Sequence, residues 1–170
     1  MANTYIQIGS TVTVGVGGTS SINFTSIPST YTDLKVVLSA RQSNAAVNAE
    51  AYIYVNADTS ASYSTRTLVG SGTAASSGSF SGNGSIVTFQ TPAATATTST
   101  FGNAEIYIPN YAGSTNKSIS IDEVCETNAT AADMRFMACL FSKTTAISSV
   151  YIDGNFVQYT TASLYGISKS

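Results

Sequence analysis

The sequence contains no histidine and no tryptophan, and it has only two cysteines and nine acidic residues in 170 positions. Histidine titrates near neutral pH without help, so its absence removes the usual proton shuttle and the commonest metal ligand. It also excludes the Ser-His-Asp and Cys-His triads of hydrolases. Charged residues form 9% of the chain, against roughly a quarter in typical globular domains. Hydroxyls, amides and backbone must therefore cover most of the surface.

The few charges are spread along the chain, with seven cations and a net charge of −2. A nucleic-acid partner is not expected, because phosphates are neutralised by clustered cations. The longest apolar run covers residues 136–141, far short of the roughly 20 residues that a membrane helix needs. Residues 1–6 contain neither the basic nor the apolar region of a secretory signal, so we expect synthesis in a cytoplasm and no membrane partner.

Serine and threonine together supply 50 of the 170 residues, and hydrophobic residues supply 43%. Apolar and polar residues alternate in many short segments, which is the pattern of half-buried strands, and helical periodicity is scarce. The pattern predicts one domain, residues 1–170, folded as an antiparallel β-sandwich of about eight to eleven strands, with the jelly roll as the leading version. The predicted strands are residues 4–8, 11–16, 21–24, 33–41, 52–55, 63–69, 85–90, 104–108, 117–126, 134–142, 150–152, 155–157 and 164–167.

Four local features refine this prediction. Asp153-Gly154 lies between two apolar triplets and predicts a hairpin with a two-residue type I′ turn. The alternation changes phase at Val124, which predicts a β-bulge there. Residues 42–50, 70–84 and 91–100 lack apolar periodicity and are interpreted as surface loops. Residues 127–133 are the one stretch that favours a short helical turn.

The two cysteines do not have a metal-binding or redox spacing. If residues 117–126 and 134–142 form a hairpin, Cys125 faces about residue 135 and lies ~13 Å along the strand from Cys139. A disulfide requires Cα atoms within about 7 Å. We therefore expect two reduced, buried thiols with a structural role.

Carboxylates offer the remaining route to catalysis or metal binding. Asp122, Glu123 and Glu126 form the one local cluster, and a pair of carboxylates is what a glycosidase needs. On a strand, however, Asp122 and Glu126 share one face while Glu123 points to the other, and the chain lacks the tryptophans on which sugars usually stack. A calcium site at this cluster, or at Asn56 and Asp58, does not match the EF-hand spacing. We therefore expect no catalytic, cofactor or metal site.

The ten tyrosines offer rigid amphipathic contact area of the kind that protein interfaces favour. About half of them are expected in the core or on sheet faces, since tyrosine is also a good strand former. Tyr31 and Tyr111 fall outside the predicted strands, and they are the interface candidates.

Four segments carry a resemblance to a known group. They are FGNAEIYIPNYAGSTNKSIS at 101–120, FTSIPSTYTDL at 24–34, NADTSASY at 56–63 and GNFVQYTTASLYGI at 154–167. Together they resemble small jelly-roll virion structural proteins of tailed bacteriophages of aquatic bacteria. The resemblance implies a jelly-roll sandwich displayed on the virion as a homotrimer, and it implies no catalytic residues.

The resemblance leaves two non-enzymatic roles open. The first is a capsid decoration (cement) protein that binds the major capsid protein or another virion protein. The alternative is a head-fibre, knob or tail-fibre module that recognises a host cell-surface glycan, with residues 70–84 in contact with it. A third hypothesis, a small enzyme acting on polysaccharide, rests only on the cluster of Asp122, Glu123 and Glu126.

Overall fold

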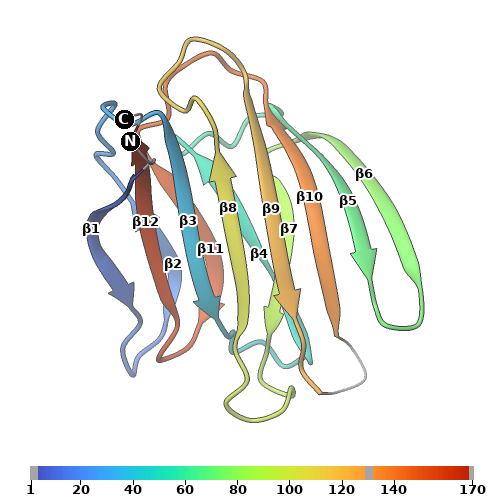
Figure 1. Ribbon diagram of the computed structural model, residues 1–170. Helices are drawn as coiled ribbons and strands as arrows, with labels where there is room; N and C mark the ends of the chain where they lie inside the picture. Colours follow the sequence, from blue (N-terminus) through green and yellow to red (C-terminus); the bar gives the residue numbers. More distant parts are fainter. Residues whose placement is uncertain (1–3, 129–131, 169–170) are drawn as a thin grey trace.

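The computed structural model describes residues 4–128 and 132–168, and every strand in these ranges pairs with its neighbours in antiparallel fashion (Figure 1). Nowhere in these ranges is there a helix with the length and apolar character needed to cross a membrane. The strands are β1 (Thr4–Thr13), β2 (Thr19–Phe24), β3 (Asp33–Ala40), β4 (Asn48–Val55), β5 (Tyr63–Gly70), β6 (Ala75–Asn83), β7 (Ile86–Pro92), β8 (Gly102–Ile108), β9 (Lys117–Cys125), β10 (Asp133–Phe141), β11 (Val150–Phe156) and β12 (Thr161–Ser168).

The strands form two sheets, and their order is that of an enlarged jelly roll. The large sheet has the order β1-β12-β3-β8-β9-β10-β5-β6, and the small sheet has the order β2-β11-β4-β7. If β5, β6, β9 and β10 are set aside, the remaining eight strands form the two facing four-stranded sheets of a jelly roll. The other four strands lie side by side, at the right of Figure 1, and widen the large sheet at one edge. We call β9-β10-β5-β6 the sheet extension. The predicted antiparallel sandwich is confirmed, with twelve strands in the described residues.

The core lies between the sheets because apolar side chains occupy every second position of the strands. In β8, for example, Ala104, Ile106 and Ile108 are buried while the residues between them are exposed. On the small sheet, residues such as Ile53 and Ile152 are equally buried and belong to the same core. This period of two lets a chain rich in serine and threonine fold, since its hydroxyls face outward and its aliphatic side chains face inward.

The predicted hairpin at Asp153-Gly154 is wrong, because β11 continues through both residues as one strand with a register irregularity before Phe156. The glycine serves another purpose. The Gln42 side chain lies against this strand, where its Oε1 accepts a hydrogen bond of 2.8 Å from the Asn155 N–H. A Cβ atom on Gly154 would lie 2.9 Å from that oxygen. Glycine is therefore needed here for close approach, not for a turn.

Several predicted boundaries also change. The bulge at Val124 is wrong, because β9 and β10 pair without a register shift and the alternation continues through a buried Glu123. The two first predicted strands are one strand, β1, with an irregularity beside Gly9. The expected loop at 70–84 contains β6, while the other two expected loops overlap the start of β4 and the end of β7. The helical turn expected at 127–133 includes residues outside the described ranges, and Asp133 begins β10.

The burial predicted for both cysteines is confirmed, but the partner position predicted for Cys125, about residue 135, is wrong by two residues. The two segments that carry them form a hairpin, in which Cys125 pairs with Asp133 and Cys139 pairs with Ile119. Both thiols are buried and free.

Gly102 provides a test of how tightly the sheets pack. A Cβ atom at this position would lie 2.8 Å from the Val124 carbonyl oxygen and 2.8 Å from Cδ of Pro92, both of which belong to stiff groups. We expect Gly102→Ala to lower the free energy of unfolding by about 1–3 kcal/mol, because the strands must move apart. Urea denaturation measures the change. Gly15→Ala is the control, since nothing lies within 4 Å of its Cβ position. Equal unfolding midpoints for the two variants would contradict the tight packing.

Candidate functional site

The outer face of the large sheet presents side chains in rows that run across the strands. One row consists of Glu105, Asp122, Phe136 and Leu68, which are consecutive partners on β8, β9, β10 and β5. The next row contains Tyr107, Ser120, Ala138 and Arg66. Because antiparallel partners point to the same side, each row is a continuous strip of surface. The first strip is polar over β8 and β9 and apolar over β10 and β5, whereas the second strip ends in the charged Arg66 on β5.

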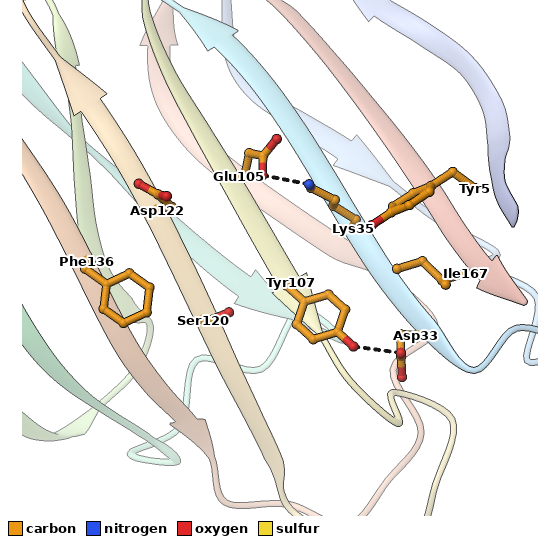
Figure 2. Close-up of a pocket in the computed structure, with 9 residues that line it drawn as sticks. All are labelled: Tyr5, Asp33, Lys35, Glu105, Tyr107, Ser120, Asp122, Phe136 and Ile167. Atoms are coloured by element: carbon orange, nitrogen blue, oxygen red, sulfur yellow. Dashed lines mark hydrogen bonds and ion pairs between the residues drawn. The ribbon is translucent and has the colours of Figure 1, made fainter. Parts of the chain in front are cut away.

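A hollow of about 440 Å³ lies over the polar part of this face (Figure 2). Ser120 and Asp122 belong to β9, in the middle of the hollow, while Tyr107 and Phe136 lie on the strands to either side. The residues lining this polar hollow are Tyr5, Asp33, Lys35, Glu105, Tyr107, Ser120, Asp122, Phe136 and Ile167.

Most charges of the polar hollow are already paired. Lys35 Nζ lies 2.6 Å from Glu105 Oε2 and 5.7 Å from the ring centre of Tyr5, where a cation–π contact adds to the ion pair. The Tyr107 hydroxyl donates a hydrogen bond of 2.7 Å to Asp33 Oδ2. This bond to a carboxylate, together with burial, raises the pKa of Tyr107 to about 12. The phenol therefore remains a proton donor at any physiological pH.

The part of the face over β10 and β5 exposes several large apolar side chains. Leu68, Met134 and Phe136 are 58%, 60% and 58% exposed, although large apolar side chains are normally buried. We call these three residues the apolar row, although Met134 lies in the row next to that of Leu68 and Phe136. A second hollow of about 300 Å³ lies among them, next to Gly70 and Ala75. A contiguous exposed apolar surface of this kind is typical of an interaction site.

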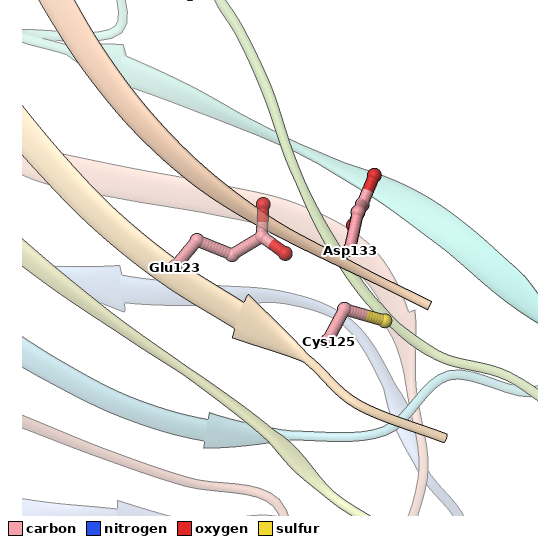
Figure 3. A group of neighbouring side chains, drawn as sticks. All are labelled: Glu123, Cys125 and Asp133. Carbon is pink, nitrogen blue, oxygen red and sulfur yellow. The ribbon is translucent and has the colours of Figure 1, made fainter. Parts of the chain in front are cut away.

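On the inner side of the same strands lies a buried polar cluster (Figure 3). Oxygen atoms of Glu123 and Asp133 and the sulfur of Cys125 all lie within 4.8 Å of one another. Arg135 completes the cluster, with its Nη2 atom 2.8 Å from Asp133 Oδ2 and its Nε atom 3.6 Å from Glu123 Oε2. Glu123 is fully buried. It faces inward because it occupies an inward position of β9, between Ile121 and Cys125.

Burial dominates the electrostatics of this cluster. It raises the pKa of Glu123 to about 8, and the nearby Gln90 N–H and Arg135 guanidinium, which favour the carboxylate, offset only part of this effect. Burial likewise raises the pKa of the Cys125 thiol to about 12. Two carboxyl groups and a thiol are a donor set that zinc accepts. Here the guanidinium of Arg135 already supplies the positive charge that balances Asp133, so the set is an internally neutralised cluster.

The cluster predicted from the sequence does not come together as a catalytic pair. Asp122 and Glu126 are exposed on the outer side of the sheet, whereas Glu123 points into the interior, as the strand alternation predicts. A glycosidase needs two carboxyl groups on either side of one bond. The local sequence cluster therefore divides between two faces.

Asn56 and Asp58, the other candidate metal ligands, belong to a tight turn. Asn56 and Ala57 have φ angles of 55° and 53°, and the Asp58 N–H donates to the Val55 carbonyl, as in a type I′ turn. The Asn56 side chain accepts a hydrogen bond of 2.8 Å from the Ser148 N–H. Asp58 binds Lys143 and the Ser60 hydroxyl, and these contacts lower its pKa to about 2. Both side chains thus hold neighbouring loops together.

The two candidate interface tyrosines, Tyr31 and Tyr111, have little exposed surface in this structure. Tyr111 is 0% exposed, packs in the core, and donates its hydroxyl proton to the Pro28 carbonyl. Tyr31 is partly buried, and its ring covers Gly166, where no Cβ would fit. Rings used in this way contribute to stability and leave little surface for a partner.

Sequence reasoning missed two buried charged residues, Glu123 and Lys117. Lys117 is 1% exposed, and its ammonium donates to the carbonyls of Gly113, Thr115 and Thr144. A signal was present for both, because each lies an even number of positions from Ile119 and Ile121 on β9.

Comparisons with known proteins add little to this geometry. No family model matches the chain, and no curated protein matches it. Among solved structures, the chain is similar to the galectin LEC-6 of Caenorhabditis elegans, at 9% sequence identity and a TM-score of 0.38, with 94% of this chain and 96% of the galectin covered. Similarity at this level supports no inference about a ligand.

The buried Glu123 predicts an unusual pH dependence of stability. Its pKa is raised in the folded state, so between about pH 4.5 and 8 the unfolded chain loses a proton that the folded chain retains. The free energy of unfolding should therefore fall as the pH rises through this window, on the order of 1 kcal/mol per pH unit. Glu123→Gln should remove this dependence, and the exposed Asp122→Asn should not. Chemical denaturation at pH 5, 6, 7 and 8 tests the expectation, and parallel curves for wild type and Glu123→Gln would contradict it.

Proposed function

We propose that this protein is a non-enzymatic structural component of a bacteriophage virion, and that it decorates the capsid as a cement protein. The apolar row of Leu68, Met134 and Phe136 is the observation that carries the proposal, and the sequence resemblance supports it. The protein is made in the cytoplasm of the bacterial host and becomes part of the particle. Its partner is the major capsid protein or another virion protein.

The outer face suits this role for a physical reason. A cement protein must bury area on neighbouring shell subunits, and exposed apolar side chains are those that gain most from burial. A sheet face held by hydrogen-bonded strands loses little conformational freedom on docking. Many identical contacts around a shell then add up, so each can be weak.

The polar hollow favours a second candidate, the host-recognition module of a head or tail fibre. Tyr107 and Phe136 offer ring faces, while Asp122 is an exposed carboxylate that can accept hydrogen bonds from sugar hydroxyls. In this version the ligand is a cell-surface glycan, and the contact lies on the sheet face instead of the expected loop at 70–84.

The number of copies per particle tests the proposed function. Quantitative mass spectrometry of purified particles would compare this chain with the major capsid protein. A copy number similar to that of the capsid protein supports the decoration role. A few copies per particle would support the fibre role, and absence from the particles would contradict both.

The docking face makes a separate prediction. We expect the double variant Leu68→Ser and Phe136→Ser to bind decoration-free capsids at least about tenfold more weakly than the wild type, because two anchors of the apolar surface are lost. Both side chains are more than half exposed, so the fold should persist. Val16→Ser, which removes an apolar side chain that is 85% exposed in a turn, is the control. Co-sedimentation with capsids measures binding, and equal binding of all three proteins would exclude this face.

A further inference from the structure

The strand β6 ends the large sheet with a free edge. Within the described residues it pairs with β5 alone, through eight of its nine residues, and it is the last strand in the order of the large sheet (Figure 1). Almost all of its residues are exposed. Its outward N–H and C=O groups therefore have no strand partner within the described residues, and another strand can pair with them.

Natural sheets usually protect such an edge with charges, prolines or irregular backbone. The β6 sequence, ASSGSFSGN, contains no charged residue and no proline. Its irregular residue, Gly82 with a φ of 69°, lies near the end of the strand. At the opposite edge of the large sheet, β1 is interrupted in its middle beside Gly9. Among the edges of this sheet, β6 is thus the one that remains regular over most of its length.

The strand is also complementary to itself. In an antiparallel pair centred on Ser79, each Gly78 faces Phe80 of the other copy, and Ser77 faces Ser81. Phe80 and Gly78 occupy the inner side of the sheet, and the Phe80 ring lies over Gly78 of its own strand, with Cε2 3.2 Å from the position of a Cβ on that glycine. The two Phe80 rings are diagonal neighbours, roughly 7–8 Å apart between backbones, and can touch. No like charges oppose each other anywhere along the pair.

We propose that two copies of this chain associate through antiparallel pairing of their β6 strands around a twofold axis at Ser79. The two eight-stranded sheets then become one continuous sheet. This inference goes beyond the proposed function and does not depend on it. It also differs from the homotrimer that the sequence resemblance implies, because two paired β6 edges satisfy each other and leave no free β6 edge for a third copy.

The full chain and its Ser79→Lys variant test the pairing by sedimentation equilibrium. We expect the wild type to form a concentration-dependent dimer. Ser79→Lys should raise the dissociation constant at least about tenfold, because two ammonium groups would meet at the axis. Ser118→Lys is the matched control, since Ser118 is an exposed serine on the interior strand β9. It should leave the dimer unchanged.

A second variant keeps the inference testable if Ser79→Lys perturbs folding. Ser79→Cys should cross-link into a covalent dimer with a short dithiol reagent, while Ser118→Cys should not. The native Cys125 and Cys139 are buried and should not react. A wild type that stays monomeric at millimolar concentration would overturn the proposal. A dimer or trimer that neither substitution at Ser79 affects would overturn it as well.

Discussion

A sheet of eight strands packed on a sheet of four cannot be covered across its whole width. The core between the two sheets includes residues of the jelly-roll half of the large sheet and also residues of the sheet extension, such as Ile121, Met137 and Phe141. The cover given by the small sheet ends within the sheet extension, where both faces of β6 are exposed. The strands of the extension therefore need other partners for their uncovered faces and for the free edge of β6. The apolar row, the buried polar cluster and the free edge of β6 all belong to the extension.

The alternation of apolar and polar residues was sufficient to predict the antiparallel sandwich and most of its strands, because burial on one face imposes that period on any sequence. It failed where a strand is not half-buried. Both faces of β6 are exposed, so nothing required apolar residues at every second position, and the strand could not be distinguished from a loop. It also failed at Gly154, because the residue that glycine accommodates, Gln42, is more than a hundred positions away in the sequence.

The site was less predictable than the fold, for a related reason. Sequence reasoning assumes that charged residues face water, so the alternation was interpreted as changing phase at Val124, with a β-bulge there, instead of continuing inward through Glu123. The buried Glu123 carboxyl lies beside Arg135, which also pairs with Asp133, and both of these residues lie on the next strand. In the same way, the exposure of Phe136 cannot be inferred from β10 alone, since residues 136–141 of this strand are apolar on both faces. Which elements cover a face is a property of the assembled sheets.

The extension is built from two hairpins that are far apart in the chain. The β5-β6 hairpin is inserted between two strands of the small sheet, and β10, the strand that pairs with β5, follows about fifty residues after β6 ends. During synthesis, the β5-β6 hairpin therefore emerges with both of its edges unpaired, and β5 has no second partner until β10 has been made. Pairings between distant segments form slowly, since a long loop must close first. A serine- and glycine-rich β6 suits the interval before β10 is made, because an unpaired strand with little apolar surface is slow to aggregate.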